Sequence, residues 1–319
     1  MKKLACIFTV FFMICAVYAK DKNENQIRVG VLNGPSCIPA AWLIEKQSVN
    51  ATYTKFADPQ ALLPKMIKKE IDIGFLPANV AAKVYNASNK AILCCAITGN
   101  GNLTVVTNAA GEGGINSLSG ETVYVAGQGA TPEYMFKYIL EKNQLKPEVD
   151  VRLDFSLSTA QLPAYLISGK IKYAVLPEPF STIAQSKSDK IKVLCDLQQE
   201  FEDYEGKGKT YPLTVMVVTK SFIEENPQLL NQFLKEYEKS YKWTIKNPLT
   251  AGQYAEKNEL GLAQGIVTAS IPKANYTYVD SKNMQPQIES LLKIFLDYAP
   301  ESIGGKLPDK AFYYDKKSN

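Results

Sequence analysis

The sequence predicts an α/β protein of two lobes, each built on a doubly wound sheet with flanking helices. Two observations lead to this fold class. Segments typical of strands and helices alternate along most of the chain, which is the pattern of a largely parallel sheet covered by helices. In addition, the stretch IDIGFLPAN at 71–79 nearly recurs as IKYAVLPEP at 171–179, 100 residues further on. The length of 319 residues also favours two domains over one.

The first half of the chain begins the alternation after residue 26. Proline marks two helix starts, at Pro39 and near Pro59, where a missing N–H costs nothing. A third helix is expected over 78–86. The strands expected here are 27–32, 53–57, 71–76, 91–97 and 103–107.

A glycine-rich segment at 111–120 interrupts this pattern, and the alternation then starts again. Helices are expected over 132–143, 159–168 and 179–186. The strands expected here are 121–127, 151–155, 171–176 and 190–197. Because two strand–loop–helix units recur in the same order, we interpret the two halves as a structural repeat.

The last third returns to the first lobe. A polar segment at 205–212 precedes an apolar strand at 213–219, and Asn226-Pro227 starts a helix with an apolar stripe. A final helix is expected over 285–298. We therefore assign residues 20–108 plus 213–319 to lobe one and 109–212 to lobe two, with the connections between the lobes near 106–112 and 206–213.

The N-terminus is typical of a cleaved signal peptide, residues 1–19. Lys2 and Lys3 precede an apolar run at 4–17 that is too short to span a bilayer, and Val17-Tyr18-Ala19 fits a cleavage site. We expect export to the periplasm or the extracytoplasmic surface. Cys15 follows isoleucine instead of a small residue, so we do not expect a lipid anchor there.

The composition excludes several kinds of function. Removing Lys2 and Lys3 leaves 34 basic and 32 acidic residues, a net charge of +2, which predicts no nucleic-acid partner. The chain has no histidine, the usual general base and metal ligand. The cysteines beyond the signal peptide lack metal-site spacing and are expected to be buried thiols. We expect no cofactor, no metal and no enzymatic activity.

A ligand of a doubly wound sheet binds beyond the carboxyl ends of the strands. The loops NGPSC, LPAN, GQGATP and LPEP occupy those positions, two in each lobe, and each leads into a helix. Two lobes that face each other through such loops form a cleft. Ordinary structural roles stay open for several of these residues: turn residues, helix caps, a core tryptophan at Trp42 and a solvated charge at Glu178.

These loops carry a resemblance to a known family. The segments RVGVLNGPSCIPAAWLIEK, IDIGFLPANVAAKVYN, GATPEYMFKYILEKN, AVLPEPFSTIAQSK and SIGGKLPDKAFYY resemble extracytoplasmic substrate-binding proteins of ABC importers. The group is the nitrate/sulfonate/taurine type, which includes binders of thiamine pyrimidine precursors. The resemblance implies a type II periplasmic-binding-protein fold, a monomer that closes on one small solute, and delivery to an ABC permease and its ATPase.

The resemblance also suggests the ligand-binding residues. With Trp42 added because it follows the first loop, the expected ligand-binding set is Asn33, Gly34, Ser36, Cys37, Trp42, Asn79, Gln128, Gly129, Thr131, Ser158 and Glu178. A related branch contains a pyrimidine-synthesising enzyme with a histidine and a cysteine-rich motif. This chain lacks both features, so that enzyme is a lesser alternative.

The residue types in the loops indicate the charge of the solute. The only arginines, Arg28 and Arg152, begin strands, and no lysine falls in the four loops. Amides, hydroxyls and the carboxylate of Glu178 suit a neutral or amino-bearing heterocycle, such as a thiamine pyrimidine precursor. Taurine, an alkanesulfonate or nitrate remains the alternative, because helix N-termini bind anions without arginine. An adhesin-like surface protein is an alternative of another class.

Overall fold

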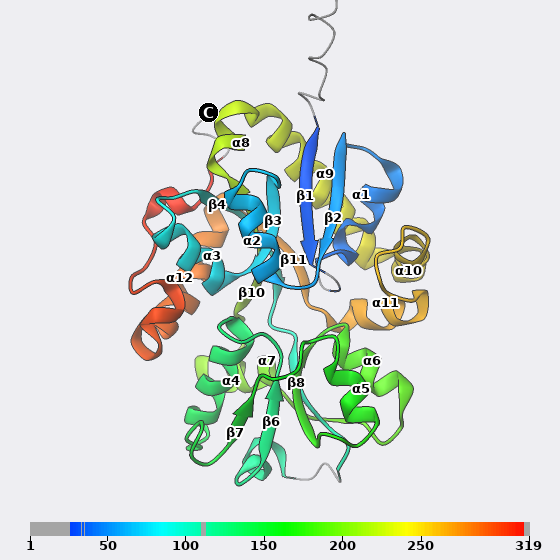
Figure 1. Cartoon of the computed structure of the whole chain (residues 1–319), viewed down its shortest axis with the longest axis vertical. Helices are drawn as coiled ribbons and strands as arrows, with labels where there is room; N and C mark the ends of the chain where they lie inside the picture. The colour runs from blue at the N-terminus through cyan, green and yellow to red at the C-terminus, as the bar shows by residue number, and fades with distance from the viewer. Residues whose placement is uncertain (1–25, 33, 35, 110–112, 316–319) are drawn as a thin grey trace, which may run out of the picture.

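The computed structural model describes residues 26–32, 34, 36–109 and 113–315, and its strands form two mixed sheets, one in each lobe (Figure 1). The expected signal peptide lies outside the described residues. The six-stranded sheet of lobe one has the order β11-β4-β10-β3-β1-β2. Its strands are β1 (Ile27–Leu32), β2 (Ala51–Phe56), β3 (Ile73–Pro77), β4 (Ile92–Asn100), β10 (Pro212–Thr219) and β11 (Tyr276–Asp280).

Lobe two contains a five-stranded sheet with the order β7-β6-β8-β5-β9. Its strands are β5 (Leu103–Thr107), β6 (Thr122–Val125), β7 (Arg152–Asp154), β8 (Tyr173–Pro177) and β9 (Lys192–Asp196). In both sheets three strands run parallel, β1 with β2 and β3, and β6 with β7 and β8. The remaining strands join antiparallel, so each sheet is mixed and not uniformly parallel.

Helices cover both faces of the lobe-one sheet. One face packs on α2 (Pro59–Ile67), α3 (Ala78–Ala87) and α12 (Ser281–Tyr298), and the other on α1 (Ala41–Lys46) and α9 (Pro227–Lys246). Cys94 and Cys95 belong to the two different cores, because neighbouring strand residues point to opposite faces. Both thiols are buried, as expected for inert cysteines. The remaining helices of this lobe are α8 (Lys220–Glu225), α10 (Pro248–Lys257) and α11 (Gln264–Ser270).

The lobe-two sheet is covered in the same way. Its helices are α4 (Thr131–Lys142), α5 (Leu162–Ile167), α6 (Phe180–Lys187) and α7 (Leu197–Glu205). The sequence analysis expected no helix where α7 forms. The Asp196 side chain accepts hydrogen bonds from the backbone N–H groups of Gln198 and Gln199 and so caps this helix.

The chain first crosses between the lobes at Gly101 and Asn102. β4 ends at Asn100 in lobe one, and β5 begins at Leu103 in lobe two, where it pairs with β8 and β9. The expected boundary after residue 108 is therefore displaced, because residues 103–107 are already a strand of the second sheet. The return crossing precedes β10, which begins at Pro212. The two crossings lie side by side, since Gly101 N donates to Tyr211 O at 2.9 Å.

The C-terminal segment is fastened to α3. The helix η4 (Pro300–Ile303) and η5 (Lys310–Phe312) follow α12. Asn86 Nδ2 donates to Ile303 O and to Lys306 O, both at 2.8 Å. Asp309 accepts from the Tyr85 hydroxyl at 2.5 Å and pairs with Lys90 at 2.7 Å. These contacts hold the lobe-one helix whose first turn faces lobe two.

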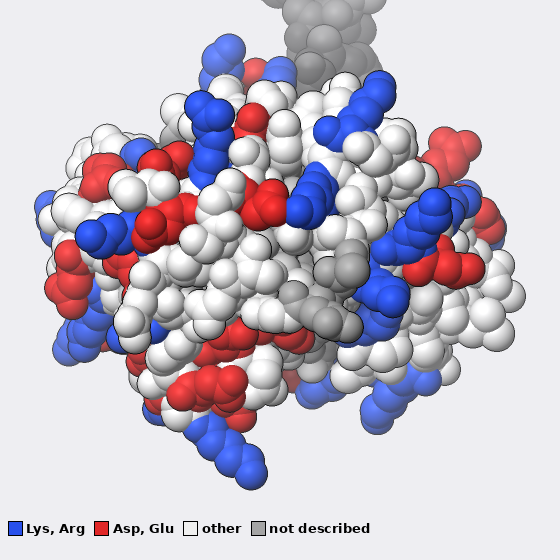
Figure 2. Space-filling view, turned by 90° about the horizontal axis from the view of Figure 1, so that it is seen from below, with Lys and Arg blue, Asp and Glu red and all other residues white. Residues whose placement is uncertain are grey.

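Positive and negative side chains are interspersed over the face in Figure 2, without one extended cationic area. In the part of the chain that the structure describes, no helix combines the length and apolar character that a bilayer crossing requires.

Candidate functional site

The expected ligand loops lie where the two lobes meet. Gly34 has a φ of +101°, which glycine adopts without strain. A Cβ atom on Gly34 would stand 3.1 Å from Phe180 Cε2 and 3.5 Å from Pro179 Cδ. Gly34 belongs to the loop after β1, and Phe180 begins α6 of lobe two. The missing side chain at this position therefore lets the two lobes approach closely.

Asn79 forms a second connection between the lobes. Its Nδ2 donates to Gly129 O at 3.1 Å and to Ser302 O at 3.2 Å, and its Oδ1 accepts from the Thr131 hydroxyl at 3.1 Å. Gly129 and Thr131 belong to lobe two, and Ser302 to lobe one. Asn79 and Thr131 are fully buried. Three of the expected ligand-binding residues are thus brought together, but they bind one another.

Glu178 is a buried carboxylate at the end of β8. Only 3% of the residue is exposed. Its Oε2 accepts a hydrogen bond from Thr182 N at 3.2 Å, and within the described residues no lysine or arginine nitrogen lies within ion-pair distance. Burial raises the pKa of Glu178, while Thr182 and the charge of Lys273 act in the opposite direction. This carboxylate lacks a strong partner within the described protein.

Two residues that the sequence analysis missed lie beside Glu178. Leu103 pairs with Pro177 at the end of the β5–β8 ladder, so Asn102 and Glu178 are the next residues beyond the paired ends of these two strands. Asn102 is 7% exposed. Tyr276 begins β11, and burial raises the pKa of its hydroxyl well above the ordinary value, with Tyr237 and the charge of Glu178 acting in the same direction. The sequence offers no local signal for Asn102, which directly precedes the strand expected over 103–107 and receives no ligand role there.

Ser36 and Cys37 serve the loop itself. The Ser36 hydroxyl accepts from Leu32 N at 2.7 Å and lies 3.1 Å from Leu32 O, to which the Cys37 thiol also donates at 3.1 Å. Burial raises the pKa of Cys37 to about 12, so this thiol stays protonated and unreactive.

The remaining expected residues are not part of these contacts. Trp42 packs against Trp243 of α9 with the ring centroids 6.4 Å apart, and Trp243 stacks on Tyr254 of α10 at 5.4 Å. The structure thus places Trp42 in an aromatic stack between lobe-one helices, because α9 covers α1. Gln128 is exposed. Ser158 is also exposed and binds Gln161 Oε1 through both its N–H and its hydroxyl at 2.9 Å. Asn33 lies outside the described residues.

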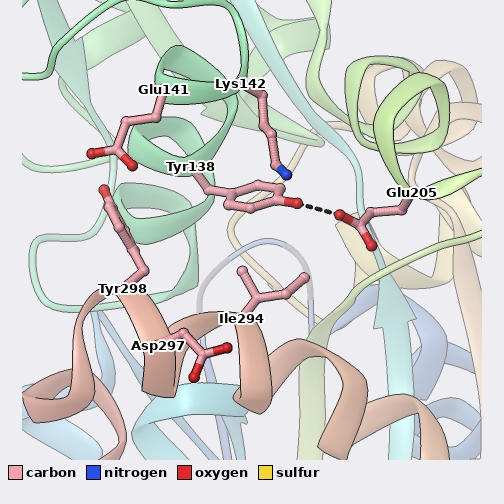
Figure 3. A pocket seen from close by; sticks show the side chains of 7 residues that line it. All are labelled: Tyr138, Glu141, Lys142, Glu205, Ile294, Asp297 and Tyr298. Carbon is pink, nitrogen blue, oxygen red and sulfur yellow. Dashed lines mark hydrogen bonds between the residues drawn. The ribbon is translucent and has the colours of Figure 1, made fainter.

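An open groove of about 600 Å³ also runs between the lobes, and none of the expected ligand-binding residues lines it. Figure 3 shows the Tyr138 hydroxyl directed at Glu205, to which it donates a hydrogen bond, and Lys142 above the same ring, 5.1 Å from its centroid. The groove is lined by Tyr138, Glu141 and Lys142 of α4, Glu205 of α7, and Ile294, Asp297 and Tyr298 of α12. Since Tyr138, Glu205 and Lys142 satisfy one another, we regard the groove as a flank of the lobe interface.

The chemistry available between the lobes is hydrogen bonding by amide, hydroxyl and carboxylate groups. Arg28 is bound to Asp72 through Nε at 2.9 Å, and Arg152 is exposed on β7 at the edge of the second sheet. Neither arginine takes part in the lobe interface. Among the described residues no group of histidine, cysteine and carboxylate side chains could hold a metal ion. The arrangement can hold and orient a small solute.

Comparison with solved structures confirms the two-lobe type II periplasmic-binding-protein fold. An ABC transporter structure from Parabacteroides distasonis is 25% identical, with a TM-score of 0.76 over 92% of this chain and 99% of that chain. The periplasmic aliphatic sulphonate-binding protein SsuA of Escherichia coli is 14% identical, with a TM-score of 0.72 over 91% of this chain and 92% of that chain.

A curated relative points the same way. YtlA of Bacillus subtilis (strain 168), named provisionally as a binding protein, is 23% identical over 189 residues, which are 58% of this chain. Those residues cover 54% of YtlA, so the chain spans about half the length of that relative. These proteins are described as transport or binding proteins, which agrees with the expected binding protein and not with an enzyme. The model of the NMT1-like family matches residues 21–256. The chain therefore belongs to the NMT1-like family.

Proposed function

We propose that this chain is the solute-binding component of an ABC import system and that it holds one neutral or amino-bearing heterocycle between its lobes. A thiamine pyrimidine precursor is the specific candidate. The protein would act as an exported monomer in the periplasm or on the extracytoplasmic surface, and it would deliver the solute to an ABC permease and its ATPase. The observation that carries the ligand class is the buried carboxylate of Glu178 at the lobe interface, which accepts a hydrogen bond from Thr182 N and has no ion-pair partner among the described residues.

Two further observations support this ligand class. A buried carboxylate without a protein partner is costly unless a ligand supplies hydrogen-bond donors or a cation. Amino groups and ring N–H groups are such donors. Both arginines are engaged or distant, so the bidentate fork that suits sulfonate and nitrate is missing from the described interface.

One observation favours the alternative ligand. Lys273 is the cation whose charge acts on Glu178, and it directly precedes the segment that borders the first crossing. A taurine or alkanesulfonate could pair with this ammonium group, since taurine also carries an amine for Glu178. The transport role is the same for both ligand classes.

A thermal-shift panel tests the proposal. A solute at a hundredfold excess over its Kd stabilises the protein by about 2.7 kcal/mol. We expect aminopyrimidines, such as 4-amino-5-hydroxymethyl-2-methylpyrimidine, to raise the melting temperature, and Glu178→Gln to reduce that rise. Native mass spectrometry of the protein purified without denaturation would identify a retained solute independently. A shift with alkanesulfonates or nitrate alone would reject the heterocycle and keep the transport role.

A further inference from the structure

The side chain of Asn102, in the crossing between the lobes, has two polar atoms with different roles: Nδ2 makes a structural hydrogen bond, and Oδ1 has no hydrogen-bond partner among the described residues. Asn102 Nδ2 donates to Ala274 O at 2.7 Å, directly before β11. Its Oδ1 is buried and has no hydrogen-bond partner among the described residues. An amide that is fixed by its nitrogen presents its oxygen in one direction, so this acceptor is held in place and unused.

Two neighbouring side chains, those of Tyr276 and Glu178, are also buried with few hydrogen-bond partners among the described residues. The Tyr276 hydroxyl is also buried without a partner in the described protein. Glu178 receives only the 3.2 Å bond from Thr182 N. Thr104, two residues after Asn102, contacts Ser181 of α6 through its hydroxyl at 2.8 Å. Thr104 and Glu178 therefore both point toward α6.

Buried polar groups in native proteins are almost always paired, and each unpaired one costs free energy. Two acceptors just beyond the ends of paired strands match two N–H donors of one solute. The exocyclic amino group of an aminopyrimidine supplies two such N–H groups. Sulfonate and nitrate have only acceptor oxygens and would leave Asn102 Oδ1 unpaired.

We propose that Asn102 contacts the solute and determines its specificity, with Asn102 Oδ1 and the Glu178 carboxylate together accepting the two N–H groups of one exocyclic amino group. This inference rests on the proposed solute-binding function and deepens it. The Tyr276 hydroxyl completes the contact, as either donor or acceptor. Because Asn102 lies in the crossing itself, the solute engages the point about which the lobes would move.

Calorimetric titration with two matched solutes tests the inference. The first is 4-amino-5-hydroxymethyl-2-methylpyrimidine, and the second is its 4-oxo analogue, in which an acceptor replaces the amino donor. We expect the unmodified protein to prefer the amino compound by about tenfold or more in Kd. Asn102→Ala should reduce that preference to within about threefold. Tyr276→Phe removes an oxygen with no internal partner and should weaken binding of both compounds by about tenfold.

Asn275→Gly is the matched control. Asn275 Nδ2 donates to Gly101 O at 2.9 Å, so this variant also loses a side-chain hydrogen bond at the crossing. Its φ of +48° is one that glycine adopts readily. The control should keep the full preference. Asn102→Ser, which retains a small polar side chain, replaces Asn102→Ala if the latter does not fold.

The outcomes separate the two proposals. If Asn102→Ala or Asn102→Ser keeps the preference of the unmodified protein, Asn102 does not contact the solute, while the proposed function stands. If the unmodified protein binds alkanesulfonates and neither pyrimidine, the heterocycle class falls and this inference falls with it. Equal loss of preference in Asn102→Ala and Asn275→Gly would show an effect of the crossing and not of a solute contact.

Discussion

Asn79→Ala tests whether the closed arrangement of the lobes depends on one amide. Two of the three hydrogen bonds of Asn79 reach lobe two, at 3.1 Å to Gly129 O and 3.1 Å from the Thr131 hydroxyl. A net contribution of about 1 kcal/mol for each bond makes the closed state about 2 kcal/mol less stable relative to an open one. That corresponds to a factor of about 30 in the closed-to-open ratio. A solute that requires closure should bind more weakly, by up to about 30-fold where the open state predominates.

Asn86→Ala provides the control from the same helix. Asn86 also donates two hydrogen bonds to the segment after α12, to Ile303 O and Lys306 O, but both partners belong to lobe one. Both variants should lower the melting temperature, since each loses contacts to that segment. Only Asn79→Ala should shift the lobes apart.

Small-angle scattering and titration measure the two effects. The radius of gyration of Asn79→Ala without solute should increase, and its Kd for the best solute of the panel should rise, by at most about 30-fold. The reasoning is refuted if Asn79→Ala and Asn86→Ala show the same scattering profile and the same affinity while both lose stability. In that case the interlobe bonds do not contribute to closure.

Three further predictions concern the crossing, the buried carboxylate and the aromatic stack. Gly101→Ala should lower the free energy of unfolding, measured with denaturant, by about 1–3 kcal/mol, because its Cβ would stand 2.5 Å from a tyrosine ring. The control Gly99→Ala should leave the free energy of unfolding nearly unchanged, because the nearest atom to its Cβ would be 3.8 Å away. Glu178→Gln should stabilise the solute-free protein at neutral pH, since burial raises the pKa of Glu178 above its ordinary 4.5 and its charged form is disfavoured. The stability difference between this variant and the unmodified protein should shrink as the pH falls through the raised pKa toward 4.5, and a difference that is constant with pH would contradict the argument. Trp42→Phe should lower the free energy of unfolding by about 1 kcal/mol through its lost contact with Trp243, and it should change the solute affinity by less than twofold. A large loss of affinity in titration would instead show that Trp42 belongs to the ligand site.

The sequence predicted the repeated units because their signals are local. Both copies of the proline turn close a strand, β3 at Pro77 and β8 at Pro177, and a helix follows each. Apolar alternation and prolines at the ends of strands and the starts of helices depend on residues only a few positions apart, so they can be recognised in the sequence without knowledge of the tertiary structure. The prolines at 39, 59 and 227 mark helix starts for the same reason.

The failures concern residues whose partners are distant in sequence. Trp42 follows a ligand loop, but its partner Trp243 comes from a helix 200 residues later. The crossing was expected at the glycines near 111, whereas strand pairing in lobe two already includes Leu103. Asn102 acquires its position from Ala274 and from the strand opposite. No local pattern encodes such a partnership.

The position of β10 has a consequence for the order in which the protein can be made. β10 lies between β4 and β3 in the lobe-one sheet, yet it follows the whole of lobe two in the chain. Lobe two is continuous from Leu103 to Glu205 and has all its strands when Asp196 has been synthesised. The first lobe then still consists of the three paired strands β3, β1 and β2 and the single strand β4, because both neighbours of β4 in the sheet, β10 and β11, come later in the chain. In a chain stopped before Pro212, lobe two could thus fold, whereas lobe one could not, because it would lack β10. We expect such a chain to depend on chaperones.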